Sequence, residues 1–451
     1  MTWLRHEWRL LWRSPLCVAA LALTLALSAS SVWSGLREVA RQREAIARLV
    51  PLAEQDTAAV AARFPHSPTA GEPAYFTYYP TWDPPSATAF MATGFRDVAP
   101  SVLRVRALGL HAQLYDGETL NPELALPGSF DFAFVLVYLA PLIVVVLLHD
   151  LVAEERRSGR LPLVLALAGA SGGLWRRRAA LRLAAIVWCL IAPLIAGAVV
   201  AGAPTGSVAV VVAAVVAYVA FWAGVASIFA VRLGAVASAT ASMAVWAVLT
   251  LILPAVAGIV VTRAIPVRQG VALMMAQRQA VHGASDRPIE ESMRRFSAHH
   301  PGWGRDAPSP PGFQWKWLFV FHQNADDEVA DEAIAYRAGL LARQGWTTRL
   351  GWILPGIGAQ TVLHRVADTD LAAQLAYQDR IVAFHRRLLA FYYPYLFNDR
   401  PFGTADFAKR PAFTPDRSPA TAGIGDGAGL LLIGALTFAA GMARLGRVRA
   451  T

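Results

Sequence analysis

The chain is poor in the residues on which disulfide-stabilised and cysteine-based metal proteins depend. Its 451 residues include only two cysteines, Cys17 and Cys189, and both lie inside apolar runs. Two such cysteines cannot form a disulfide framework or a cysteine-rich metal site. Charged residues make up 16% of the chain and hydrophobic residues 55%, whereas about a quarter of a soluble domain is charged. This composition is typical of a membrane protein.

Lysine is also nearly absent, and this excludes one class of nucleotide site. A phosphate-binding loop needs glycine and lysine followed by serine or threonine, but neither lysine, Lys316 or Lys409, follows a glycine. The sequence also lacks the His-Glu-x-x-His pairing of zinc hydrolases. We therefore expect no enzyme activity, no catalytic residue and no cofactor in this chain.

Histidine and methionine in the second half of the chain raise the question of a copper or zinc site. The relevant residues are His282, His299, His300, His322, Met274 and Met275. Imidazole and thioether groups are suitable ligands, but adjacent His299 and His300 precede a proline and no helical pairing is present. We expect surface or packing histidines and no metal site.

Six apolar runs are long enough to cross a bilayer, which requires roughly 20 residues as a helix. They cover residues 15–34, 131–149, 181–203, 207–231, 235–262 and 427–445. Two long polar segments, 35–130 and 263–425, separate them. We predict an all-α polytopic membrane protein with six transmembrane helices, an N-terminal interfacial helix at 1–14 and two mainly helical insertions with minor β-structure.

The formal net charge of +10 is unevenly distributed. Residues 1–14, 150–182, 232 and 444–451 hold fourteen arginines and only four acids. Arginine in short loops marks the cytoplasmic side of a membrane. We therefore expect both termini and the 150–180 segment in the cytoplasm and both long segments outside, in a bacterial inner membrane. A basic nucleic-acid surface is the weaker interpretation, and we expect no nucleic-acid partner.

The N-terminus resembles a signal peptide, but we expect an uncleaved first span. Before that span, Arg5, Arg9 and Arg13 repeat every four residues along one helical stripe, and Trp8 and Trp12 lie on a neighbouring stripe. Such an amphipathic helix is expected in the membrane interface; the alternative is a merely positive flank.

The long segments contain their own periodic patterns. We predict helices at 36–64, broken near Pro51, and at 267–283, 324–344 and 358–393, a strand or loop at 74–85, and an extended connector at 401–419. An acidic cluster follows Asn324 and consists of Asp326, Asp327, Glu328, Asp331 and Glu332. Its spacing does not fit a calcium loop, and we interpret it as the acidic N-terminus of a helix.

Residues 153–171, AEERRSGRLPLVLALAGAS, place a charged turn directly between two spans. Glycine at 159 permits a turn that a larger residue would strain. An ordinary basic loop would explain the arginines of this segment, but not its glutamates or its leucines.

Together with TGFRDVAP (93–100), NPELALPGSFDFAFVLVYLAPLIVV (121–145) and RQAVHG (278–283), this pattern resembles the ABC-2-type permeases. These are membrane subunits of one class of ATP-binding-cassette transporter. The subgroup with large periplasmic loops, often labelled multi-copper enzyme maturation permeases, is the most similar. The resemblance covers nearly the whole chain, although Arg160 stands where relatives commonly have threonine.

The resemblance implies a coupling helix that docks into a separate ATPase subunit, which would hold ATP and magnesium. The coupling residues it implies are Glu154, Glu155, Gly159, Arg160, Leu161 and Leu163. It also implies a second permease protomer, identical or paralogous. Two functions stay open: a transport permease, or a mechanical scaffold that drives a periplasmic partner without passing substrate through its spans.

Overall fold

The structure is a computed structural model, and it describes residues 2–115, 130–167, 173–267, 270–303, 312–416 and 424–448. Six helices are long and apolar enough to cross a membrane. Strands within the described ranges form only two two-stranded sheets. The predicted all-α polytopic fold is therefore confirmed.

The spans form a bundle in which two helices are interrupted by a π-turn. Its helices are α2 (Pro15–Arg63), α5 (Phe132–Phe134) with η3 (Val135–Leu139) and α6 (Ala140–Leu148), α9 (Gly173–Ala201), α10 (Thr205–Arg232), α11 (Ala235–Ala247) with η4 (Val248–Ile252) and α12 (Leu253–Ala264), and α20 (Ala428–Leu445). The π-turns η3 and η4 lie just before Pro141 and Pro254. A proline cannot donate to the preceding turn and collides with it, and a π-turn accommodates both effects within a continuous span.

Helix α10 is the centre of the bundle and packs against α6, α9, α11, α17 and α20. It buries Tyr218 and Trp222 completely. Its contact with α20 is a backbone contact, because a Cβ atom at Gly224 would lie 2.2 Å from the carbonyl oxygen of Thr437. Small residues allow this close approach of membrane helices.

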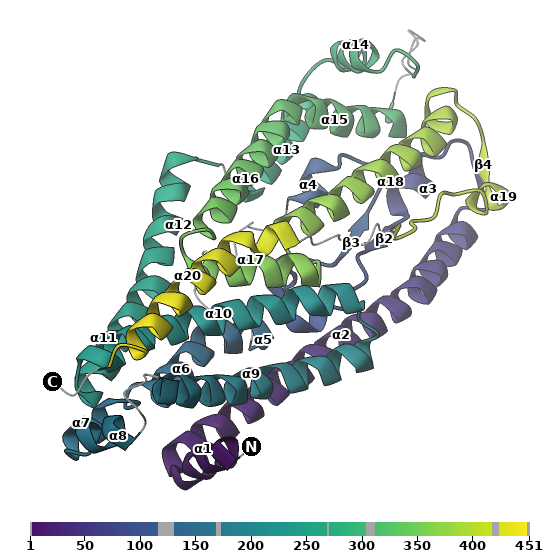
Figure 1. Cartoon of the computed structure of the whole chain (residues 1–451). Helices are drawn as coiled ribbons and strands as arrows, with labels where there is room; N and C mark the ends of the chain where they lie inside the picture. The colour runs from purple at the N-terminus through teal and green to yellow at the C-terminus, as the bar shows by residue number, and fades with distance from the viewer. Residues whose placement is uncertain are drawn as a thin grey trace.

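Two ends of the bundle differ in character (Figure 1). At one end lie both termini, α1 (Thr2–Arg13), α7 (Ala153–Arg157) and α8 (Leu161–Leu167). We call it the arginine-rich end, because it carries the thirteen arginines of the short segments that lie within the described residues. At the other end lies a domain built from residues 64–115 and 270–416, which we call the loop domain.

Both long polar segments of the chain contribute elements to the loop domain. From the first segment come β1 (His66–Ser67), α3 (Gly71–Phe76), β2 (Tyr79–Trp82), η1 (Ala89–Met91), η2 (Gly94–Asp97), β3 (Val102–Val105) and α4 (His111–Leu114). From the second come α13 (Gly270–Ser285), α14 (Ile289–His299), α15 (Trp315–Glu328), α16 (Ala330–Leu350), α17 (Pro355–Ala367), α18 (Leu371–Phe397), β4 (Phe402–Gly403) and α19 (Thr404–Phe407). The short turn η5 (Ile424–Gly427) then leads into α20. Antiparallel pairing of β1 with β4 links the two segments, whereas β2 pairs with β3 inside the first. One aromatic core contains side chains from both segments, such as Tyr79 and Tyr392.

Helix α2 is continuous, which corrects the predicted break near Pro51. Its 49 residues would extend about 74 Å at 1.5 Å per residue. Pro51 lies on an exposed face, where water can solvate the carbonyl group that loses its partner. Beyond the proline, α2 buries Ala61 in the aromatic core of the loop domain, so tertiary packing overrides the local break.

Two further helix predictions need correction. The predicted helix at 324–344 is divided at Val329 between α15 and α16, so Asp326 and Asp327 lie in the last turn of α15. Only Asp331 and Glu332 lie in a first helical turn, that of α16. The helix predicted at 358–393 is divided between α17 and α18, where Asp368 has a left-handed backbone and Asp370 caps α18.

Candidate functional site

The connector between the second and third spans folds into the short helices α7 and α8 with a tight turn between them. Gly159 has a φ of 67° and donates its N–H to the Arg156 carbonyl. This left-handed conformation is strained for residues with a Cβ, and nothing lies within 4 Å of a Cβ placed there. Glycine is therefore required by the backbone of the turn and not by packing. Residues 168–172, which include the end of the implied coupling segment, lie outside the described residues.

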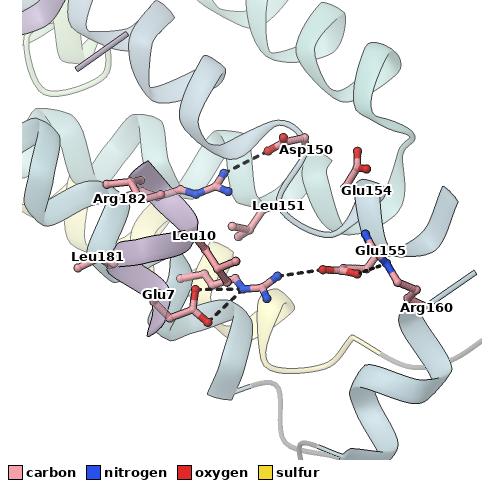
Figure 2. A pocket seen from close by; sticks show the side chains of 11 residues that line it. Glu7, Leu10, Asp150, Leu151, Glu154, Glu155, Arg160, Leu181 and Arg182 are labelled. Atoms are coloured by element: carbon pink, nitrogen blue, oxygen red, sulfur yellow. Dashed lines mark hydrogen bonds and ion pairs between the residues drawn. The ribbon is translucent and has the colours of Figure 1, made fainter. Parts of the chain in front are cut away.

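A chain of ion pairs fixes this connector to α1 and α9 (Figure 2). Arg178 of α9 donates to both carboxylate oxygens of Glu7 at 3.2 Å and lies 3.3 Å from Glu155. The second oxygen of Glu155 lies 3.2 Å from Arg160. The Glu7 side chain is only 4% exposed, so Arg178 neutralises a charge that would be costly to bury alone.

Three more arginines bind this end of the bundle together. Arg182 lies 3.1 Å from Asp150 and closes the other side of a cavity of about 250 Å³, which is also lined by Glu7 and Glu155. Arg156 donates to the Val231 carbonyl at the end of α10, and Arg176 donates to the Met442 carbonyl near the end of α20. Cationic groups are favourable at helix C-termini. Arginine contacts therefore join the connector to α9 and α10, and join α9 to α20.

The implied coupling residues divide into an anchoring face and an exposed face. Glu155 lies in the ion-pair chain, and Leu161 is buried against the bundle. Glu154 pairs with Arg157 at 2.7 Å in an exposed position, and Leu163 is 61% exposed. The surface available to a partner thus includes Glu154, Arg157, Arg160 and Leu163.

Helix α1 has the amphipathic arrangement that the spacing of its residues predicts. Arg5, Arg9 and Arg13 are exposed. Trp8 and Trp12 pack edge to face at 6.1 Å between ring centres and remain exposed. A third stripe, containing Glu7 and Leu11, is the face that packs against the protein. The sequence did not predict that Glu7 is a buried ion-pair partner, because an acidic residue in an arginine-rich helix is expected on the surface.

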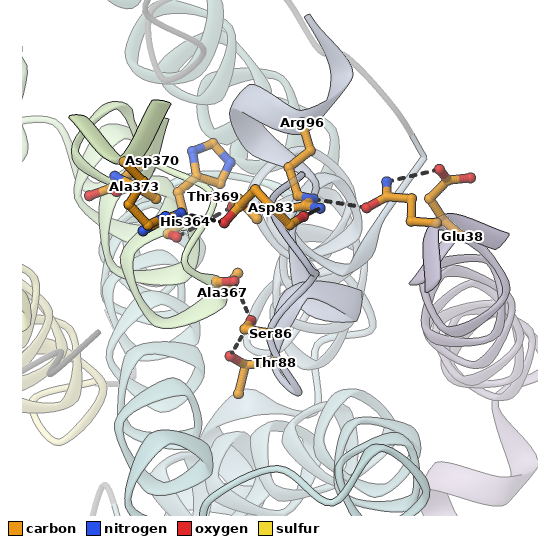
Figure 3. Close-up of polar contacts among 12 residues, drawn as sticks. Glu38, Asp83, Ser86, Thr88, Arg96, His364, Ala367, Thr369, Asp370 and Ala373 are labelled. Atoms are coloured by element: carbon orange, nitrogen blue, oxygen red, sulfur yellow. Dashed lines mark hydrogen bonds and ion pairs between the residues drawn. The ribbon is translucent and has the colours of Figure 1, made fainter. Parts of the chain in front are cut away.

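At the opposite end, hydrogen bonds and ion pairs join the two loop segments (Figure 3). Asp83 accepts from Arg96 at 2.8 Å and from Arg380 at 2.6 Å, and the Asp83 carboxylate is nearly fully buried. Arg96 also donates to Gln42 on α2. The Asp83 carboxylate therefore links the first loop segment to α18, and Arg96 links the same segment to α2.

The turn after α17 is joined to the first loop segment through backbone carbonyls (Figure 3). Ser86 donates to the Ala367 carbonyl and Thr88 to the Val366 carbonyl, both at 2.6 Å. The Phe95 N–H donates to the Thr369 carbonyl at 2.7 Å. At the start of the second span, Asp131 accepts from the Thr93 N–H at 2.9 Å and from the Phe134 N–H at 2.8 Å. A movement of that span would therefore displace the loop-domain residues bonded to Asp131.

Asp326, from the acidic cluster, is a buried acceptor inside the loop domain. It accepts from the Leu110 N–H and, at 3.1 Å, from Gln277. Burial lowers the pKa of nearby His322 to about 4, and the charge of Asp326 only partly opposes this shift. His300 is bonded to Asp327 at 2.9 Å. Within the described ranges no three His, Cys, Asp or Glu side chains come together as a metal site.

In the described residues, polar contacts at both ends of the bundle join the spans to the segments that flank them. The arginine-rich end has an exposed, charged and partly apolar face that ion pairs hold to the bundle, and the loop-domain end has contacts between span and domain. Sequence reasoning found the exposed residues of the connector, but it missed Arg178, Asp150 and Arg182 as its anchors.

A family model described as a domain of unknown function, DUF3526, matches residues 271–416. The match begins in α13 and ends beyond α19, so it covers most of the second loop segment, including α17. No curated protein and no solved structure matches the chain.

Proposed function

We propose that the chain is the membrane-spanning permease subunit of an ABC-2-type transporter. In this proposal a separate ATPase subunit hydrolyses ATP and pushes on α7 and α8, and the movement of the spans carries a substrate across a bacterial inner membrane. The termini and the connector face the cytoplasm, and the loop domain faces the periplasm. Two permease protomers, identical or paralogous, complete the pathway.

The observation that carries the proposal is the two-sided connector at the arginine-rich end. Its inner side is anchored by Glu155, Arg178 and Glu7, and its outer side presents Glu154 and Leu163. A loop needed only for topology has no reason to be both braced and partly apolar on its exposed side. A segment that transmits force from a partner to the spans requires both attachment to the bundle and an exposed surface that contacts the partner.

Cross-linking would test the contact. A single cysteine at Leu163, in a chain whose two native cysteines are replaced by alanine, should form a cross-link to a co-purifying P-loop ATPase. A cysteine at the equally accessible Ile334 of the loop domain is the control, since it is 67% exposed. Purified protein that retains no ATPase, or that cross-links equally at both positions, would contradict the proposal.

A mechanical subunit is the second candidate, and one contact favours it. Helix α17 of the loop domain packs directly on α10 in the bundle, so span movement can reach the loop domain without an open pathway. An ATP-bound structure of the complete assembly separates the two. A continuous cavity between protomers indicates transport, and closely packed spans in every nucleotide state indicate force transmission to a periplasmic partner.

A further inference from the structure

Part of the loop domain lies at the depth of the membrane spans. Near the middle of α10, the Tyr218 hydroxyl is 3.8 Å from the Cβ position of Gly356, at the start of α17. Helix α17 also packs against η4, which is central in the fifth span. Crossing about 30 Å of hydrocarbon takes about 20 residues, so the middle of a 28-residue helix such as α10 lies well within it.

Two further contacts fix the depth of the turn between α16 and α17. Arg343 of α16 donates to the Ile265 carbonyl, at the end of the fifth span, at 2.8 Å. Trp352 packs on Gly429 in the first turn of the sixth span, where a Cβ would lie 2.8 Å from its ring. From Arg343 onward, α16 therefore continues past the end of α12 toward the bundle interior, and the turn lies beside the start of α20 (Figure 1).

The exposed side of this turn is apolar and aromatic. Trp346 and Trp352 are about half exposed, and Ile353 is 68% exposed. The Arg349 guanidinium lies 5.1 Å from the centre of the Trp346 ring. Tryptophan with arginine is the composition found where protein meets lipid headgroups. Water would be a poor environment for this surface, which lies beside α12 and α20, two span helices that expose apolar side chains of their own.

The backbone of the turn is compatible with hydrocarbon, where unsatisfied polar groups cost several kcal/mol. The N–H groups of Gly351, Trp352, Ile353 and Leu354 all donate to carbonyls of the preceding helical turn. Pro355 has no N–H to satisfy. A close crossing of Gly351 and Gly358 makes the hairpin narrow, because a Cβ at Gly358 would lie 2.6 Å from the Gly351 oxygen.

We propose that the α16–α17 turn is a lipid-binding anchor, with Trp346, Trp352 and Ile353 inserted into the leaflet at the loop-domain end of the bundle. The occupant of this surface is therefore the acyl and headgroup region of the same bilayer. The anchor holds α17 in the bundle while the rest of the loop domain stays in water. The inference needs only that the spans cross a bilayer, and it does not depend on an ATPase partner.

Depth-dependent quenching tests the anchor. In a chain with Cys17 and Cys189 replaced by alanine, Ile353→Cys and Ile334→Cys each receive a bimane label. The labelled proteins are reconstituted into phosphatidylcholine nanodiscs with or without acyl chains brominated along their length. Ile334 is the matched control because it is an equally exposed isoleucine about 24 Å farther along α16.

The label at position 353 should lose most of its fluorescence in the brominated nanodiscs, and the label at 334 should lose none. Absence of quenching at 353 would overturn the proposal, and so would equal quenching at both positions, since the whole helix would then lie on the membrane. A nitroxide at the same two cysteines gives an independent reading. It should be more accessible to oxygen than to a polar nickel complex at 353, with the reverse at 334.

Discussion

The two ends of the bundle are held by different kinds of interaction. At the arginine-rich end, ion pairs such as those of Arg178 and Arg182 join α1, the connector and α9 around a cavity. At the loop-domain end, α17 is buried almost along its whole length, packs against α10 and α20, and accepts hydrogen bonds from the first loop segment. Ion pairs near water are adjustable and sensitive to salt, whereas close packing is stiff. The comparison indicates a responsive arginine-rich end and a rigid loop-domain end.

The largest effect is expected where backbones touch at the rigid end. Gly358→Val places a Cβ 2.6 Å from the Gly351 oxygen, and overpacking of this kind costs about 3 kcal/mol of unfolding free energy. Thermal unfolding in detergent, followed by tryptophan fluorescence, measures it. Gly345→Ala on α16 is the control, since nothing lies near its Cβ position. Equal stability of the two variants would show that the hairpin is not closely packed.

The next largest effect should come from the anchor of the responsive end. Arg178→Met leaves the buried Glu7 carboxylate without its partner, at a cost of about 2 kcal/mol for a partly buried pair. Arg157→Met, which breaks the exposed pair with Glu154, should cost less than about 0.5 kcal/mol. Adding Glu7→Gln to Arg178→Met should restore part of the lost stability. If both single variants behave alike, the ion-pair chain does not brace the connector.

A pH effect is expected in the loop domain. Burial lowers the pKa of His322 from 6.5 to about 4, so between these values the unfolded chain binds a proton that the folded chain excludes. The contribution of the neutral His322 to the free energy of unfolding is therefore complete above pH 6.5. It is lost as the pH falls toward 4, and the loss is of the order of 1–2 kcal/mol. His322→Gln should flatten this pH dependence in unfolding experiments. The exposed His282, changed to glutamine, should leave it unchanged.

The smallest expected effect is a different response of the two ends to ionic strength. Raising ionic strength from 0.1 to 1 M shortens the screening length from about 10 Å to about 3 Å. Amides of α7 should then exchange hydrogen faster by a few fold, because the solvent-exposed ion pairs Glu154–Arg157 and Glu155–Arg160 weaken. Amides of α17 should keep their protection. Equal salt responses in the two helices would remove the distinction drawn between the ends.

The sequence predicted the elements with strong periodicity or strong charge bias. The six spans followed from apolar runs, and Gly159 was identified as a turn residue before its positive φ was seen. Three of the acidic residues after Asn324, namely Asp326, Asp327 and Glu328, were misassigned because first-turn acids and last-turn acids look alike in one dimension. Asp326 is held in its place by Leu110 and Gln277, contacts that cross more than 200 and about 50 residues of chain, respectively.

The position of α17 could not be predicted for a related reason. Its sequence, PGIGAQTVLHRVA, is too short and too polar to read as a span. Its burial depends on the glycine crossing with Gly351 and on a place between α10 and α20 that only the assembled bundle creates. Likewise, Arg178 is one of three consecutive arginines, and only the register of α9 directs this one toward Glu7.

The rate of ATP hydrolysis in the reconstituted complex tests the central claim most directly. The tagged chain is purified with its P-loop ATPase, and ATP turnover is compared for the native chain, Leu163→Asp and Val98→Asp. Leu163 and Val98 are both exposed apolar residues, at the arginine-rich end and in the loop domain respectively. The proposed coupling predicts that Leu163→Asp abolishes stimulation of the ATPase and that Val98→Asp preserves it. Full stimulation with Leu163→Asp, or no ATPase partner at all, would contradict the account.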